Sequence, residues 1–379
     1  TDVDDKIIKS SNEKKISISD LTQTVIKSFS EDCNYLNCEN PTQQPKATEH
    51  IDLMIEMISE LIKKDFAYEN NKHVYFEVKK FDDYGQLSNK KLEELIAGSR
   101  IEVSDNKKNS EDFVLWKPSL EDEPSWDSPW GKGRPGWHLE CSAMSKKFLG
   151  NEFDIHGGGI DLIFPHHENE IAQSCSYHSN KKMANFFMHN GSLNLEGKKM
   201  SKSTGNIVSL GDLLGKYSGP VIRLAMLSTH YRQPIDWTEK NLQQSKNILK
   251  KWSNKLNQIS NKDSKESIPE GVYKSLLDDL NTPQALSHMH KYFNNKEYDK
   301  LKNSIEIMGF TSHSLTEGND IKSKNTQISE LEILTLIDER KDARTRKDYK
   351  KSDEIRNKLE IRGIRLQDED NETTWEFIE

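Results

Sequence analysis

The chain has 379 residues, of which 33% are hydrophobic and 31% charged, and its net charge is −8. This length predicts two or three globular domains. Four cysteines argue against a disulfide framework and favour a reducing, cytoplasmic setting, and no apolar run is long enough to span a membrane. With this net charge, any contact with nucleic acid must come from local basic patches.

The first forty residues predict one clear helix. Residues 1–6 are typical of a strand end that turns into a helix, with Thr1 as a helix N-cap and the aspartates favouring the positive end of the helix dipole. Residues 19–29 predict a helix. Cys33 and Cys38 follow in a polar loop, and because no second cysteine pair exists we interpret them as incidental.

A mixed α/β segment comes next. Apolar residues at helical spacing predict an amphipathic helix over 51–62, which is core. Val74, Phe76 and Val78 alternate and predict a strand. Turns are expected at 82–85 and 106–109, before the chain reaches residue 130.

The most informative stretch is 136–206, which contains a candidate metal site. Cys141 lies in a predicted helix with apolar positions at 139, 144 and 148, and Pro165 suits a first helical position. A helix from Pro165 would place His166 and Glu170 on one face. A thiolate, an imidazole and a carboxylate are zinc ligands. The alternative is a buried small cysteine and a His/Glu pair that only caps or solvates a helix. A zinc ion usually has four ligands, so the fourth coordination position would be taken by a further protein ligand, a water or a substrate.

A glycine triplet follows the strand predicted at 153–156. Gly157, Gly158 and Gly159 would let the backbone approach a ligand beyond the strand's end. Open parallel sheets bind nucleotides at that edge, although a tight turn explains a glycine triplet equally well.

A double-lysine motif closes the stretch. Leu193 and Leu195 alternate before a turn at 196–198, so the run 199–203, Lys-Met-Ser-Lys-Ser, follows a short hairpin. Lys199 and Lys202 could neutralise charge on a triphosphate and on departing pyrophosphate. The alternative is an ordinary solvated loop.

The remaining chain is mainly helical. Helices are predicted over 238–259, 273–280, 283–293 and 296–308, followed by a polar linker at 311–327. Residues 331–379 predict two helices and a two-stranded unit. This segment is locally basic, which a solvated helix surface would also explain; its basic residues are Arg340, Lys341, Arg344, Arg346, Lys347, Lys350, Lys351 and Arg356.

Taken together, the chain resembles the cysteinyl-tRNA synthetase family of class I aminoacyl-tRNA synthetases over essentially its whole length. The motifs that carry the resemblance are 1–6 (TDVDDK), 133–138 (GRPGWH), 140–144 (ECSAM), 154–159 (DIHGGG), 164–170 (FPHHENE) and 199–203 (KMSKS).

The resemblance implies an α/β fold: a Rossmann-like nucleotide-binding catalytic core, a helical bundle and a small α+β anticodon-binding domain. We expect the core at 1–237 with a connective insertion at about 63–130, the bundle at 238–310, the linker at 311–329 and the anticodon-binding domain at 330–379. Trp116, Trp126 and Trp130 would pack the seam between insertion and core, and Trp375 could stack on an unpaired base.

The resemblance also implies the site residues. Cys141, His166 and Glu170 correspond to three of four protein zinc ligands, and the fourth is a cysteine that precedes this chain's first residue. Gly157, Gly158, Gly159 and Lys202 would bind ATP, with Lys199 and Lys202 catalytic. The implied substrate-binding residues are Thr1, Trp137, His156 and Asp161. His167 and Glu168 are expected to support the ligands or to face solvent.

The implied reaction uses cysteine, ATP with Mg²⁺, and tRNA. The cysteine carboxylate attacks the α-phosphate of ATP, pyrophosphate leaves, and a ribose hydroxyl of the tRNA then attacks the adenylate. One Zn²⁺ per chain would select a thiol over a hydroxyl. We expect a monomer without membrane contact.

One departure from the family pattern is the lack of a His-Ile-Gly-His-type motif, so we expect that the chain lacks an N-terminal strand–helix unit. Three alternatives stay open: a cysteine ligase of the same fold acting on an amino sugar, a zinc hydrolase, and a noncatalytic tRNA-binding paralogue. The basic C-terminal segment argues against the first, and the 199–203 motif argues against the other two.

Overall fold

The computed structural model describes most of the chain as two compact units. The described residues are 1–89, 106–179, 182–200, 208–213, 216–256, 268–310, 330–346, 348–361, 364–369 and 372–377. The first unit comprises Thr1–Cys33, Glu39–Ser192 and Tyr231–Ile235, and the second comprises Asn34–Cys38, Leu193–His230 and Asp236–Glu379. The four domain limits predicted from the sequence stay predictions, and the linker at 311–329 lies outside the described residues.

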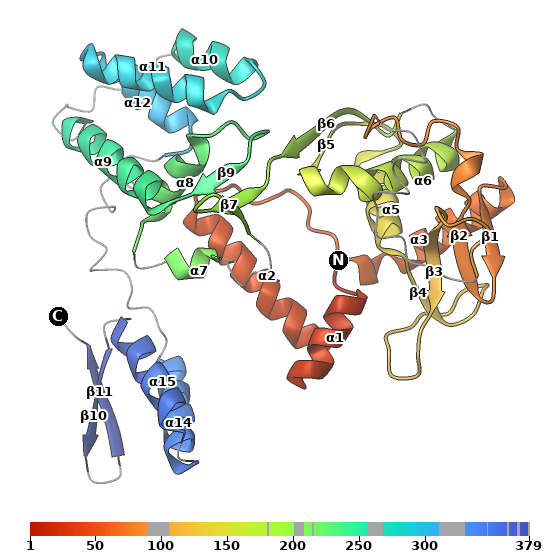
Figure 1. Cartoon of the computed structure of the whole chain (residues 1–379), viewed down its shortest axis with the longest axis horizontal. Coiled ribbons are helices and arrows are strands. Elements are labelled where there is room, and N and C mark those ends of the chain that lie inside the picture. The colour runs from red at the N-terminus through yellow and green to blue at the C-terminus, as the bar shows by residue number, and fades with distance from the viewer. Residues whose placement is uncertain are drawn as a thin grey trace. The chain divides into compact units, whose positions relative to one another are not determined.

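The first unit contains several helices, a four-stranded antiparallel sheet and a separate pair of parallel strands (Figure 1). Its helices are α1 (Asp5–Lys14), α2 (Ile18–Tyr35, which runs into the second unit), α3 (Ile51–Lys63), α5 (Trp137–Leu149) and α6 (Glu168–His178). Its strands are β1 (Ala67–Asn70), β2 (His73–Phe76), β3 (Phe113–Pro118), β4 (Gly133–Pro135), β5 (Phe153–Gly159) and β6 (Ala184–Asn190). Short helical turns lie at Ala47–Glu49, Val78–Lys80, Ile160–Leu162 and Ile163–His167.

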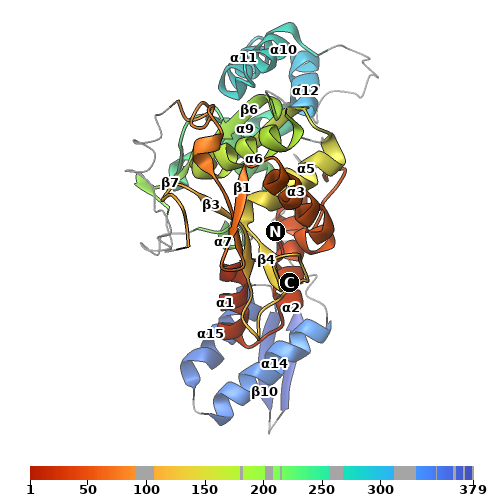
Figure 2. The same cartoon turned by 90° about the vertical axis from the view of Figure 1, so that its right-hand side faces the viewer.

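The core of this unit lies between α3, the sheet and the helices α5 and α6. Met54, Ile58 and Leu61 on the apolar face of α3 are fully buried, as the helical spacing predicted. Ile55 and Ile62 are partly buried against the same core. Trp116 and Trp130 are buried in the same core with ring centroids 6.1 Å apart. The sheet order is β1-β2-β3-β4, and Figure 2 shows β1, β3 and β4 near α3. The core therefore joins the middle segment of the chain to the two helices that carry the candidate metal ligands.

Strands β5 and β6 pair in parallel, which brings residues far apart in sequence to one edge. The register places Gly157 opposite Met188, Gly158 opposite His189 and Gly159 opposite Asn190. The predicted strand at 153–156 is confirmed but extends further, because all three glycines belong to β5. The prediction that the glycines lie beyond the strand's end was therefore wrong.

The second unit contains a small sheet and a set of helices. The sheet has the order β8-β7-β9 and is formed by β7 (Leu193–Leu195), β8 (Lys198–Lys199) and β9 (Ile235–Trp237). The helices before residue 310 are α7 (Leu210–Leu213), α8 (Gly219–Leu227), α9 (Glu239–Leu256), α10 (Glu270–Leu277), α11 (Thr282–Asn294) and α12 (Tyr298–Ile307). The predicted hairpin and the four predicted helices are confirmed. Asn281 caps α11 by accepting a hydrogen bond from the backbone N–H of Gln284 at 3.1 Å.

The C-terminal segment forms its own small core. Helices α14 (Glu330–Thr345) and α15 (Tyr349–Ile361) pack with the antiparallel hairpin of β10 (Ile364–Glu369) and β11 (Glu372–Phe377), as predicted (Figure 2). Trp375 packs against this core. Arg340 is buried and so does not belong to the predicted basic surface, and Lys347 lies outside the described residues.

Three local expectations were wrong. No strand is formed within residues 1–4, and α1 begins at Asp5. Cys33 lies within α2 rather than in a polar loop, because that helix continues to Tyr35. Val78 lies in a helical turn after β2, where its backbone N–H meets Asp112 instead of a sheet partner.

Among the described residues, no helix combines the length and the apolar character needed to cross a bilayer.

Candidate metal centre

The structure brings the three predicted metal ligands together where α5 faces α6. Cys141 Sγ lies 3.7 Å from His166 Nε2, and that nitrogen lies 2.6 Å from Glu170 Oε1. His166 and Glu170 are buried, and Cys141 is half-buried. A sulfur, a nitrogen and an oxygen donor thus lie within 4.8 Å of one another, which is the donor chemistry of a zinc site.

The helix that carries Glu170 begins later than predicted, and His166 lies in the turn before it. Phe164 has extended backbone (φ −135°, ψ 133°) inside the turn Ile163–His167, so the regular helix α6 starts at Glu168 and not at Pro165. The four-residue spacing still places His166 and Glu170 in contact. Ser142 of α5 donates a hydrogen bond to Gln173 Oε1 of α6 at 2.6 Å, which ties the two helices at the level of the site.

Glu170 is a buried carboxylate without aligned hydrogen bonds. Its Oε1 and Oε2 lie 2.6 and 2.8 Å from the Nε2 atoms of His166 and His156. Yet within the described part of the chain neither oxygen, nor His156 Nε2, has a partner in hydrogen-bond geometry. Buried carboxylates are normally saturated with hydrogen bonds, so this arrangement fits a bound cation.

Burial and neighbouring groups shift the pKa values of Glu170 and Cys141 in opposite directions. Burial opposes ionisation of Glu170, but the neighbouring His156 and His166 hold its pKa down, at about 2. Burial, followed by the charge of Glu170, raises the pKa of the Cys141 thiol. Glu170 is therefore ionised at neutral pH, whereas Cys141 needs a cation to be present as thiolate.

Two histidines that the sequence reasoning did not assign complete the cluster. His138 Nδ1 lies 2.8 Å from His166 Nδ1, and His167 Nδ1 lies 2.8 Å from His189 Nε2. Burial and the nearby His166 lower the pKa of His138 to about 3, and burial lowers that of His167 to about 4. The rings of His138 and His167 are therefore neutral at pH 7. No strand was predicted around His189, and it is the parallel pairing of β5 with β6 that places it opposite Gly158.

His156 belongs to a second donor group that overlaps the first. His156, His167 and Glu170 also place ligand atoms within 4.8 Å of one another. The rings of His156 and His167 are 4.4 Å apart. The structure thus brings the predicted substrate residue His156 directly to the candidate metal ligands, with Glu170 shared by both groups.

The other predicted substrate residues lie at different places. Trp137 is 48% exposed, and its ring centroid lies 4.2 Å from that of His166. Asp161 follows the glycines, and its Oδ1 would lie 2.5 Å from a Cβ at Gly159, so a larger residue there would displace the Asp161 carboxylate. Thr1 donates a hydrogen bond to the backbone carbonyl of Val3 at 2.8 Å, which is a local contact.

His167 and Glu168 do not face solvent, contrary to one of the two expectations for them. Both are buried. Glu168 accepts hydrogen bonds from the backbone N–H groups of Gly85 at 3.0 Å and Ser88 at 2.7 Å. His167 and Glu168 therefore help to hold the site in place through buried contacts.

The double-lysine motif is only partly described. The backbone of Lys199 pairs with Asn194 in the β7–β8 hairpin of the second unit. Lys202 and its two serine neighbours lie outside the described residues.

Comparison with known proteins places the chain among similar sequences. A family model described as tRNA synthetases class I (C) catalytic domain matches residues 1–247. The chain is 57% identical over 383 residues to Cysteine–tRNA ligase of Pelagibacter ubique (strain HTCC1062), covering 100% of this chain and 84% of that protein. It is 45% identical over 386 residues to Cysteine–tRNA ligase of Beijerinckia indica subsp. indica, covering 99% of this chain and 84% of that protein.

A solved structure shares the fold. Methionyl-tRNA synthetase of Mycobacterium tuberculosis, in complex with methionyl-adenylate, aligns with a TM-score of 0.55 over 83% of this chain and 81% of that chain. The sequence identity is 12%, so this likeness concerns the fold alone.

Proposed function

Because this chain belongs to the cysteine–tRNA ligase family of class I aminoacyl-tRNA synthetases, we propose that Cys141, His166 and Glu170 hold the zinc ion that selects its amino acid. The protein is an enzyme that charges tRNA with cysteine. The observation that carries the zinc proposal is the buried carboxylate of Glu170, whose two oxygens face imidazole nitrogens without hydrogen-bond geometry.

Zinc would select cysteine over serine because it prefers a soft sulfur ligand to a hydroxyl oxygen. A zinc ion held by these residues binds a thiolate strongly and the hydroxyl of serine poorly at neutral pH. Packing against an isostere cannot supply that discrimination. Among the protein's own groups, His138 contacts Nδ1 of His166 and so directs Nε2 toward Cys141 and Glu170.

The nucleotide is assigned to the edge formed by β5 and β6. Gly157, Gly158 and Gly159 leave the backbone accessible, and open parallel sheets bind nucleotides at the carboxyl ends of their strands. Trp137, His156, Asp161 and Thr1 are assigned to cysteine and adenosine. ATP would enter with Mg²⁺, and Lys199 and Lys202 would stabilise the charge that develops on the phosphates.

The reaction has two steps, formation of the adenylate and transfer to tRNA. A carboxylate oxygen of cysteine attacks the α-phosphorus of ATP, the bond to the bridging oxygen breaks, and pyrophosphate leaves. A hydroxyl of the terminal tRNA ribose then attacks the carbonyl carbon of the adenylate and loses its proton, and AMP leaves. The ester bond to tRNA is the product.

The remaining assignments concern the whole chain. We assign the connective insertion to about 63–130, the helical bundle to 238–310 and anticodon binding to 330–379, with the basic side chains of α14 and α15 contacting phosphates. We assign the protein to the cytoplasm, as a monomer.

The test combines metal content with cysteine-dependent ATP–pyrophosphate exchange, using serine as the control amino acid. We expect one zinc per chain, exchange with cysteine and near silence with serine. Cys141→Ser should lose zinc and exchange, whereas Cys175→Ser, a buried cysteine outside the cluster, should keep both. Exchange that survives complete removal of zinc would contradict the proposal.

The relatives do not favour the alternatives. An amino-sugar ligase, a zinc hydrolase and a noncatalytic paralogue would each differ from the tRNA ligases that this chain resembles over its whole length.

A further inference from the structure

The three glycines of β5 follow one another in sequence, but their side-chain positions have different neighbours. Among the described residues, a Cβ at Gly157 would meet only the Met188 carbonyl oxygen within 4 Å, at the ordinary contact distance of 3.6 Å. A Cβ at Gly158 would lie 2.9 Å from Cε1 and 3.1 Å from Nε2 of His167, and 3.0 Å from Cδ1 of Leu162. These distances are shorter than normal carbon contacts of about 3.5–4.0 Å. The His167 ring therefore occupies the space that a side chain at Gly158 would need.

The His167 ring is enclosed on its other sides. His167 is 2% exposed. Its Nδ1 lies 2.8 Å from His189 Nε2, and its ring centroid lies 4.4 Å from that of His156 and 6.2 Å from that of Phe187. Protein interiors are close-packed, so an added methyl group displaces its neighbours instead of filling spare room. A side chain at position 158 would therefore push the His167 ring against the other rings of the cluster.

Strand pairing brings the residues around this ring together. Gly158 of β5 lies opposite His189 of β6 in the parallel register. The strand residue without a side chain makes room for the His167 ring, and its partner across the sheet contacts Nδ1 of that ring. We call Gly158, Leu162 and His189 the His167 seat.

The position of His167 matters for the candidate metal ligands. His167, His156 and Glu170 place ligand atoms within 4.8 Å of one another. Glu170 also belongs to the group with Cys141 and His166, and its Oε2 lies 2.8 Å from His156 Nε2. A displaced His167 ring would thus disturb His156 and Glu170. Loss of a group that orients metal ligands commonly lowers metal affinity by about 10–100-fold.

A glycine inside a strand has two common explanations, the close approach of a ligand and the close approach of another part of the protein. At Gly158 the protein's own imidazole takes the space, whereas at Gly157 the space stays open. We propose that Gly158 is a positioning residue of the metal centre, whose missing side chain seats His167 and on which zinc affinity and selection of cysteine depend. Gly157 is then the glycine whose open side is left for ATP. The inference rests on the proposed function.

The experiment compares Gly158→Ala with Gly157→Ala, because the two changes add the same methyl group at neighbouring positions. Zinc affinity is measured by competition with a chromophoric chelator, and KM values for cysteine and ATP are measured by ATP–pyrophosphate exchange. Gly158→Ala should lower zinc affinity by about tenfold or more and raise KM for cysteine, while KM for ATP stays within about twofold. Gly157→Ala should keep zinc affinity and KM for cysteine and should act on KM for ATP alone.

A double variant tests the His167 seat directly. His167→Ala removes the two ring atoms that the added methyl group would strike. In this background, Gly158→Ala should cause little further loss of zinc affinity, so the two losses should not add. If Gly158→Ala alone does not fold, the double variant should recover a cooperative thermal transition. Additive losses, or a double variant as unstable as Gly158→Ala, would contradict the proposed seat.

Gly211→Ala is a control outside the site. Gly211 lies in α7 of the second unit, and in the part of the chain that the structure describes its Cβ would meet only Ser209 Oγ, at 3.5 Å. This variant should match the unmodified enzyme in zinc affinity and in both KM values.

The outcomes separate this inference from the proposed function. Equal effects of Gly157→Ala and Gly158→Ala on zinc affinity would overturn the inference alone, and so would a Gly158→Ala variant whose KM rises for ATP and not for cysteine. An unmodified protein without zinc or without cysteine-dependent exchange would instead overturn the proposed function, and this inference with it.

Discussion

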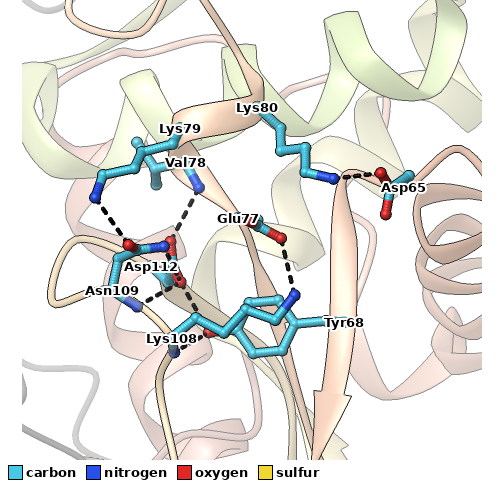
Figure 3. Close-up of polar contacts among 9 residues, drawn as sticks. All are labelled: Asp65, Tyr68, Glu77, Val78, Lys79, Lys80, Lys108, Asn109 and Asp112. Carbon is cyan, nitrogen blue, oxygen red and sulfur yellow. Dashed lines mark hydrogen bonds and ion pairs between the residues drawn. The ribbon is translucent and has the colours of Figure 1, made fainter.

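Glu170 and Asp112 are two carboxylates of the same unit, each 1% exposed, with opposite surroundings. Asp112 accepts hydrogen bonds from Tyr68 Oη and from backbone and side-chain nitrogens of its neighbours. Glu170 has imidazole nitrogens within 2.8 Å but no aligned donor among the described residues. Hydrogen bonds saturate Asp112 (Figure 3), whereas Glu170 would be saturated by the proposed zinc ion.

We therefore expect Asp112 to serve the stability of the fold and Glu170 to serve metal binding. A buried polar group that is saturated contributes to stability, and its loss leaves donors unpaired. A buried charge held without hydrogen bonds costs stability unless a cation binds it. Substitutions at the two positions should therefore act on different measurements.

The largest effect is expected at Glu170. Glu170→Gln should lower zinc occupancy and reduce cysteine-dependent exchange by more than about a hundredfold, the upper end for loss of even an outer partner of a metal ligand. Metal analysis and exchange kinetics test this together. A variant that keeps its zinc would remove Glu170 from the site.

Asp112→Ala should show the reverse pattern. It should lower the stability of the first unit by about 2–3 kcal/mol, because buried donors lose their acceptor. Zinc content measured on the folded fraction should stay unchanged. Thermal unfolding with metal analysis tests the prediction, and normal stability would show that water replaces the carboxylate.

Tyr68→Phe should be milder than Asp112→Ala. Tyr68 Oη donates to Asp112 and accepts from the Lys108 backbone N–H at 2.6 Å, so the variant loses two hydrogen bonds but keeps the ring. We expect a loss of about 1 kcal/mol and normal exchange activity. A double variant with Asp112→Ala should be less destabilised than the sum, since the two share a bond. Additive losses would contradict this coupling.

The smallest effect concerns pH. Burial opposes ionisation of Asp5, but Lys117 and Arg134 lower its pKa from 3.8. A carboxylate with a lowered pKa stabilises the folded state above its unfolded pKa, and that contribution is lost as the pH falls below about 4. Asp5→Asn should therefore flatten the acid limb of melting temperature against pH. Asp5 is more than half exposed, so the change should be less than about 2 °C. An acid limb as steep as that of the unmodified protein would contradict it.

Much of the fold was predictable because local patterns decide it. The periodicity of residues 51–62 predicted α3, and the alternation at Leu193 and Leu195 predicted the β7–β8 hairpin. Pairings were not predictable in the same way. The three glycines are part of β5 because they pair with β6, some thirty residues later in the chain. A local sequence pattern cannot predict such a long-range pairing.

Sequence patterns alone were enough to predict the family, helices such as α3 and α9, and the three metal-ligand candidates, because ligand chemistry and four-residue spacing are local properties. Only the tertiary structure decided that His138 and His189 join the cluster, since long-range packing brings them there. It also decided that Asp112 is satisfied while Glu170 is not. Hydrogen-bond saturation depends on neighbours from distant segments, so composition and spacing carry no record of it.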